Sequence, residues 1–158
     1  MRKIFILTFF IIGAFAVEAQ ELNWHTDVRE PIAINNKEKK PLMMFFTGSA
    51  WCGWCIRLQN EVLKTPEFQK WAKENVVLVE LDYPKGAVQT PQTPEIINQN
   101  AELLQAFGVR GYPTVHFATA ESKDGKVNFK GLGNTGYVAG GPTAWLAVAD
   151  GIIKSQKM

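Results

Sequence analysis

The chain contains only two cysteines, Cys52 and Cys55, and two residues separate them. A continuous apolar run over residues 42–46 precedes the pair, and apolar residues at helical spacing follow it. An apolar run of this length between turn signals is typical of a buried strand. The pair therefore lies where a buried strand passes into a helix, and few folds place a cysteine pair there.

The start of a helix gives a cysteine unusual chemistry. Unpaired backbone N–H groups and the positive end of the helix dipole both favour an anion at this point. They lower the pKa of the Cys52 thiol and make a thiolate available. The thiolate can attack a disulfide, and Cys55, one helical turn further, can resolve the mixed disulfide that forms.

Two other uses of the pair stay open from the residues alone. A zinc site needs about four ligands, and the remaining candidates, His25 and His116, are far apart in the sequence. A structural disulfide stabilises most when it closes a long loop, whereas this pair closes almost none. His116 is expected to be a half-buried strand residue, so reactivity explains the pair better than metal binding or stability.

The N-terminus has the order of regions that is typical of a secretory signal peptide. Arg2 and Lys3 precede an uncharged run over residues 4–17, and Ala19 follows shortly after. We expect a signal peptide over residues 1–19 and a mature domain over residues 20–158, exported to the periplasm or secreted. The alternative is an uncleaved anchor, but a spanning helix needs about 20 apolar residues. After cleavage we expect no stable insertion into the membrane.

Length and charge exclude several classes of protein. The chain has 158 residues, which is enough for one domain with its own core. Its 17 basic and 15 acidic residues give a net charge of +2 and form no basic stripe. Nucleic-acid binding therefore has no electrostatic support. An exported chain meets an oxidising compartment, in which disulfides persist.

Helical and strand patterns alternate along the chain and predict an α/β fold. The result is a central mixed β-sheet with helices on both faces, closed by an antiparallel hairpin that turns at residues 124–125. A long loop over residues 83–92 and a flexible glycine-rich connection over residues 131–141 are also expected. The predicted strands are residues 42–46, 76–81, 114–118 and 126–130, and the predicted helices are residues 27–36, 56–64, 65–72, 93–107 and 142–153.

Two segments carry a resemblance to a known family. Residues 46–55 (FTGSAWCGWC) resemble the active-site strand, turn and helix of the thioredoxin superfamily, and are most similar to secreted bacterial members with a Cys-Gly-Trp-Cys site. Residues 107–115 (FGVRGYPTV) resemble the family's cis-proline loop. The resemblance covers about residues 24–155 and implies a thioredoxin-like fold.

The resemblance also implies roles for single residues. Cys52 would be the attacking thiol and Cys55 the resolving one. Pro113 would be cis and lie against the pair, leaving the Tyr112 backbone to bond an extended substrate. For the aromatic residues, ordinary packing is the alternative. The implied substrate-binding residues are Trp51, Gly53, Trp54, Tyr112 and Pro113.

One feature of many thioredoxins is missing. A buried aspartate on the strand before the motif moves protons at the resolving cysteine in those proteins, and residues 43–46 contain no ionisable group. Alternation places Leu78, Glu80 and Asp82 on one face of the next strand. Glu80 is therefore a candidate proton relay. The alternative for Glu80, and the stronger expectation for Asp82, is a strand-end carboxylate that reaches solvent.

The resemblance implies a thiol–disulfide oxidoreductase without metal or organic cofactor, acting on the disulfides of exported proteins. The thioredoxin-like sequence favours a reductase fed by a membrane electron donor. A disulfide oxidase or isomerase in protein folding is one alternative. A non-catalytic binding module on the same scaffold is another, but it would have no need of Cys52, Cys55 and Pro113 together.

Overall fold

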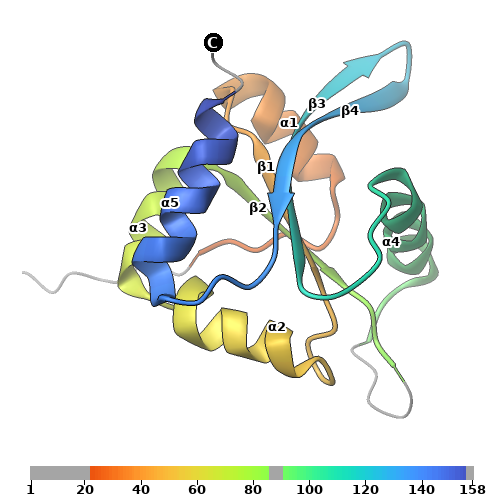
Figure 1. Cartoon of the computed structure of the whole chain (residues 1–158). Helices are drawn as coiled ribbons and strands as arrows, with labels where there is room; N and C mark the ends of the chain where they lie inside the picture. Colours follow the sequence, from red (N-terminus) through yellow and green to blue (C-terminus); the bar gives the residue numbers. More distant parts are fainter. Residues whose placement is uncertain (1–21, 86–90, 156–158) are drawn as a thin grey trace, which may run out of the picture.

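The computed structural model of the chain describes residues 22–85 and 91–155 (Figure 1). The predicted signal peptide over residues 1–19 lies outside the described residues, as does part of the predicted loop over residues 83–92. The account below concerns the described part of the chain.

Four strands and five α-helices form the domain, with a π-helical segment, η1, directly after α2. The strands are β1 (Leu42–Thr47), β2 (Val77–Asp82), β3 (Thr114–Lys123) and β4 (Lys126–Thr135). The helical segments are α1 (Arg29–Glu38), α2 (Gly53–Leu58), η1 (Gln59–Leu63), α3 (Pro66–Asn75), α4 (Pro94–Ala106) and α5 (Gly141–Lys154).

The strands form one mixed sheet in the order β2-β1-β3-β4. β1 and β2 are parallel, whereas β3 runs antiparallel to both β1 and β4. Figure 1 shows α3 and α5 on one side of the sheet and α4 on the other. The predicted α/β architecture, with helices on both faces of a mixed sheet, is confirmed.

Strand β1 is the centre of the packing, because all six of its residues are buried. Met43 and Phe45 point into a cluster beneath α2, α3 and α5 that also contains Phe68 and Trp145. Its other side chains join a second cluster, beneath α1 and α4. Burying a large apolar side chain contributes about 1.5–3 kcal/mol, so the two clusters hold β1 in place from both sides.

Local signals determine where two helices start. Thr65 and Thr93 are N-caps whose hydroxyls accept a hydrogen bond from the backbone N–H three residues later, and a proline follows each of them. The predicted break near Thr65 is confirmed, and it follows the π-helical turn η1. The first helix continues to Glu38, beyond the predicted end at residue 36. Among the described helices, none is long and apolar enough to cross a membrane.

The glycine-rich stretch corrects one prediction. Residues 131–135 do not form a flexible connection but the second half of β4, and β3 likewise extends to Lys123. Gly131 and Gly133 pair with Ala118 and Phe117 across a β-bulge. A Cβ on Gly133 would lie 2.9 Å from the side chain of Ile152. These glycines therefore mark a close approach of α5 to the sheet, which is a recognised use of glycine in a strand.

Candidate active site

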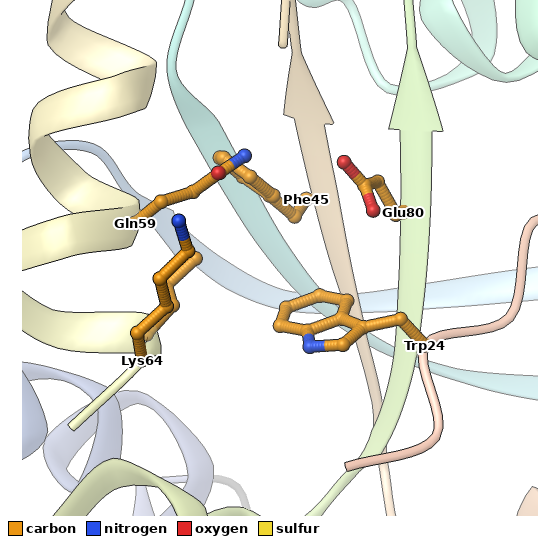
Figure 2. A pocket seen from close by; sticks show the side chains of 6 residues that line it. Trp24, Phe45, Gln59, Lys64 and Glu80 are labelled. Atoms are coloured by element: carbon orange, nitrogen blue, oxygen red, sulfur yellow. The ribbon is translucent and has the colours of Figure 1, made fainter. Parts of the chain in front are cut away.

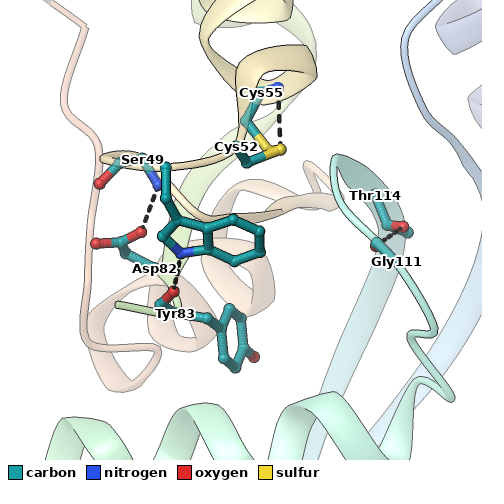
Figure 3. Close-up of a disulfide and its surroundings, with 8 residues drawn as sticks. Ser49, Cys52, Cys55, Asp82, Tyr83, Gly111 and Thr114 are labelled. Carbon is teal, nitrogen blue, oxygen red and sulfur yellow. Dashed lines mark hydrogen bonds between the residues drawn. A yellow bond between two sulfur atoms is a disulfide. The ribbon is translucent and has the colours of Figure 1, made fainter. Parts of the chain in front are cut away.

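Cys52 and Cys55 form a disulfide at the start of α2, with their Cα atoms 5.2 Å apart (Figure 3). Cys52 is the N-cap of this helix and has an extended backbone. The backbone N–H of Cys55 points at the Cys52 sulfur, 3.2 Å away. A sulfur at this position accepts a hydrogen bond that a helix start leaves unused, and such a bond favours the thiolate once the disulfide is reduced.

The two sulfur-bearing residues differ in access to solvent. Cys52 keeps 7% of its surface exposed, whereas Cys55 is fully buried in the cluster beneath α2. A protein partner can therefore reach the disulfide only from the Cys52 side.

The turn before the disulfide depends on Gly48. The backbone N–H groups of Trp51 and Cys52 both donate to the Gly48 carbonyl, at 3.1 Å and 2.8 Å. A Cβ on Gly48 would lie 2.4 Å from the indole of Trp51. Any side chain here would displace the indole, so Gly48 belongs to the site, although the sequence analysis did not single it out.

Trp51 is held on the side of the disulfide that faces the cis-proline loop. Its indole N–H donates to the Tyr83 carbonyl at 2.8 Å (Figure 3), and its ring meets the Tyr112 ring edge-on at 5.7 Å. The Tyr112 ring also packs on Tyr83 at 5.3 Å. The side chain of Trp51 is thus fixed while 39% of the residue stays exposed.

The Tyr112–Pro113 peptide bond is cis, as the resemblance implies. The aromatic contacts of Tyr112 connect this loop to Trp51 and therefore to the cysteine pair. The structure thus brings together two sequence segments that are 60 residues apart, and their roles toward a substrate remain predictions.

Trp54 lies on the other side, between the two cysteines in sequence, and is 55% exposed. Its ring packs against Tyr137 at 5.2 Å. Gly53 is exposed, and a Cβ there would meet nothing within 4 Å. The structure therefore gives no steric reason for glycine at position 53.

Asp82 corrects another expectation, because it does not reach solvent. The residue is only 8% exposed, and its Oδ1 accepts a hydrogen bond from the Ser49 backbone N–H at 2.8 Å (Figure 3). Its carbonyl accepts from the side chains of Gln92 and Asn100. Asp82 therefore ties the end of β2 to the turn that carries the disulfide.

Glu80 is half-buried on β2, beside Phe45 of β1. It lines a cavity of about 180 Å³, into which Gln59 and Lys64 also point (Figure 2). Burial raises the pKa of the Glu80 carboxyl, and the nearby charge of Asp82 raises it further. Gln59 follows Cys55 by about one turn of the same continuous helical segment, so the cavity extends from Glu80 toward the buried cysteine.

The two histidines lie apart from this site. His116 is half-buried in β3, as predicted, and its ring packs against those of Phe46 and Phe107. Burial lowers the pKa of His116. His25 forms a backbone bridge to Val79 of β2. Over residues 22–85 and 91–155, no three histidine, cysteine or acidic side chains gather into a candidate metal site.

A reactive cysteine pair at the end of a buried strand, facing a cis proline across an aromatic contact, defines the class of thioredoxin-fold dithiol proteins. The family model described as "Thioredoxin-like domain" matches residues 28–151, and the chain belongs to this family. Together with the similarities below, the disulfide makes the chain a thiol–disulfide oxidoreductase.

Individual relatives agree with this assignment. "Disulfide bond reductase DsbH" of Chlamydia pneumoniae is 31% identical over 138 residues, which cover 87% of this chain and 76% of that protein. "Thioredoxin-related protein DsbJ" of the same organism is 31% identical over 107 residues, 68% of this chain but only 30% of DsbJ.

Solved structures show the same fold. The structure titled "DsbH Oxidoreductase" superposes with a TM-score of 0.73 at 27% identity, covering 98% of this chain and 95% of that one. A thioredoxin from Thermus thermophilus gives a TM-score of 0.59 at 18% identity, covering 83% and 86%, and supports the fold alone.

Proposed function

We propose that this protein is a reductase of disulfides in exported proteins. The observation that carries the proposal is the placement of the pair: Cys52 is the accessible sulfur at a helix start, and Cys55 is buried directly behind it. The direction of the reaction is supported by the similarity to a relative whose printed name is disulfide bond reductase, three quarters of which this chain covers.

The proposed reaction has two exchange steps. The Cys52 thiolate attacks one sulfur of the substrate disulfide, a mixed disulfide forms, and the other substrate sulfur leaves as a thiolate. Cys55 loses its proton and attacks the Cys52 sulfur, so that the second substrate sulfur leaves. The net result transfers two electrons and two protons from the protein dithiol to the substrate, and leaves the Cys52–Cys55 disulfide.

We further propose that the exposed residues around Cys52 bind the substrate polypeptide. Trp51 and Tyr112 would form one wall of this surface and Trp54 the other, with Gly53 and Pro113 between them. Support comes from the fixed but partly exposed rings of Trp51 and Trp54 on either side of the disulfide.

Glu80 is proposed to take the proton from Cys55 in the second step. A buried carboxylate with a raised pKa is a stronger base toward a thiol than an exposed one. The cavity shared by Glu80 and Gln59 is large enough for water molecules, and water would carry the proton between the carboxylate and the buried sulfur.

Export and electron supply complete the proposal. We propose that residues 1–19 are a signal peptide and that residues 20–158 are the mature domain. A reductase in an oxidising compartment must itself be reduced after each turnover. A membrane protein that passes electrons outward is the proposed donor.

The cysteine variants test the reaction directly. With dithiothreitol as reductant, the unmodified protein is expected to reduce the interchain disulfides of insulin. Cys52→Ala should give only the background rate, because it removes the attacking sulfur. Cys55→Ala should stop at the first step and accumulate a covalent adduct, seen as an added substrate mass. The two variants are matched controls, and equal adduct formation by both would contradict the assigned roles.

Glu80→Gln should slow release of the mixed disulfide by about tenfold or more at pH 7, since general bases typically contribute at least that much. The deficit should shrink toward pH 9, where an ordinary thiol, with a pKa of about 8.5, ionises unaided. Stopped-flow measurement of the second step provides the test. Glu102→Gln, an exposed carboxylate on α4, is the control. Equal rates for Glu80→Gln and unmodified protein at pH 7 would exclude the relay.

The same variant should change stability in a defined direction. Because the folded pKa of Glu80 is raised, its favourable contribution is present below the unfolded pKa and is lost as pH rises through the folded pKa. Glu80→Gln should therefore stabilise the fold at pH 7 relative to pH 4, as measured by urea unfolding. This readout separates a burial effect from an effect on proton transfer.

Signal cleavage predicts the mass of the exported protein. Expression of the full chain in a bacterium should yield a soluble periplasmic protein that begins at Gln20. Recovery of the protein only in the membrane fraction, with Met1 still present, would show instead that the N-terminal segment is an anchor.

A further inference from the structure

Four side chains from two distant segments meet beside the disulfide, and we call them the Trp54 cluster: Trp54, Arg57, Glu61 and Tyr137. Three of them lie on the continuous helical stretch formed by α2 and η1. Tyr137 comes from the segment between β4 and α5. The sequence analysis singled out only Trp54.

The contacts within the cluster form a closed circuit. The Arg57 guanidinium lies over the Trp54 ring at 5.3 Å and over the Tyr137 ring at 5.0 Å. Glu61 accepts from Arg57 Nε on one carboxylate oxygen, at 2.7 Å, and from the Tyr137 hydroxyl on the other. Cation–π contact and charge-assisted hydrogen bonds both fix orientation. The circuit therefore limits the rotation of the Trp54 ring.

Tyr137 is the anchored member of the cluster, because its neighbour Gly136 is held on two sides. The buried indole of Trp145 donates to the Gly136 carbonyl at 3.0 Å. A Cβ on Gly136 would lie 3.1 Å from the carbonyl oxygen of Pro113. The backbone before Tyr137 is thus packed between the core and the cis-proline loop.

Trp54 keeps 55% of its surface exposed although its ring is held in place. A large apolar ring held in water beside a reactive disulfide gains most when a partner covers it with apolar surface. The adjacent charge of Arg57 is balanced by Glu61, so the cluster offers little attraction for a charged residue. An apolar side chain on the substrate suits this surface better.

We infer that Tyr137 is a positioning residue for disulfide exchange. Through Glu61 and Arg57 it holds the Trp54 ring as a fixed apolar surface near Cys52, and this surface selects protein disulfides whose reacting cysteine has an apolar neighbour. The inference rests on the proposed reductase function, since it concerns the substrate of the same site.

Three disulfides test the inference. Two are symmetric disulfide-linked peptides that are identical except for leucine or serine next to the cysteine. The third is bis(2-hydroxyethyl) disulfide, which has no side chain to place on Trp54. The unmodified protein should prefer the leucine peptide by about tenfold in kcat/KM, mostly through KM, since one apolar group has about that effect in a binding pocket.

Tyr137→Leu should reduce this preference to below about threefold and leave the rate with bis(2-hydroxyethyl) disulfide unchanged. Trp54→Ala should abolish the preference, and adding Tyr137→Leu to it should cause no further loss, because coupled residues are not additive. Tyr137→Phe keeps the ring but removes the bond to Glu61, and should weaken the preference partly. It decides the question if Tyr137→Leu fails to fold.

Asp150→Asn is the matched control. Asp150 also accepts from a residue four positions away, Lys154, and from an aromatic N–H, that of Trp71. It lies in the C-terminal half of α5, which Figure 1 places away from the start of α2. This variant should keep the full preference for the leucine peptide.

Two results would overturn the inference: an unchanged preference in Tyr137→Leu or, if that variant does not fold, in Tyr137→Phe, or an equal loss on all three disulfides, which would indicate a purely structural role. Failure of the reductase proposal looks different, because the unmodified protein would then reduce none of the three.

Discussion

Strand β1 is buried on both faces, and the site depends on this packing. Because apolar clusters hold the strand from both sides, its end at Thr47 has a fixed position. The turn at Gly48 then carries Cys52 to the start of α2, where the N–H of Cys55 reaches its sulfur. A small displacement of β1 would move the accessible sulfur relative to the cis-proline loop on the next strand.

Much of this arrangement could be predicted from the sequence, because the signals are local. The apolar run before the cysteines predicted β1, and threonine followed by proline predicted two helix starts correctly. Two short motifs in the right order predicted the fold and the cis bond at Pro113. Each of these features depends on neighbouring residues, so no knowledge of the tertiary structure was needed.

The features that were wrong or missed depend on contacts between distant segments. Alternation placed Asp82 on the correct face of β2 but could not show that Ser49, 33 residues earlier, would bury it. Composition suggested a flexible chain over residues 131–135, whereas pairing with β3 makes it a strand. Tyr137 follows that stretch, and its contact with Glu61 spans 76 positions. The spacing of Arg57 and Glu61 was the only sequence signal for this cluster.

The central claim is that this oxidoreductase acts as a reductase, and the reduction potential of the Cys52–Cys55 pair tests it most directly. The mature protein would be equilibrated with dithiothreitol or glutathione buffers, and its dithiol and disulfide forms quantified. The account predicts a value near about −270 mV, the range of thioredoxin. A value of roughly −180 to −120 mV would place the protein with disulfide isomerases and oxidases and would contradict the account.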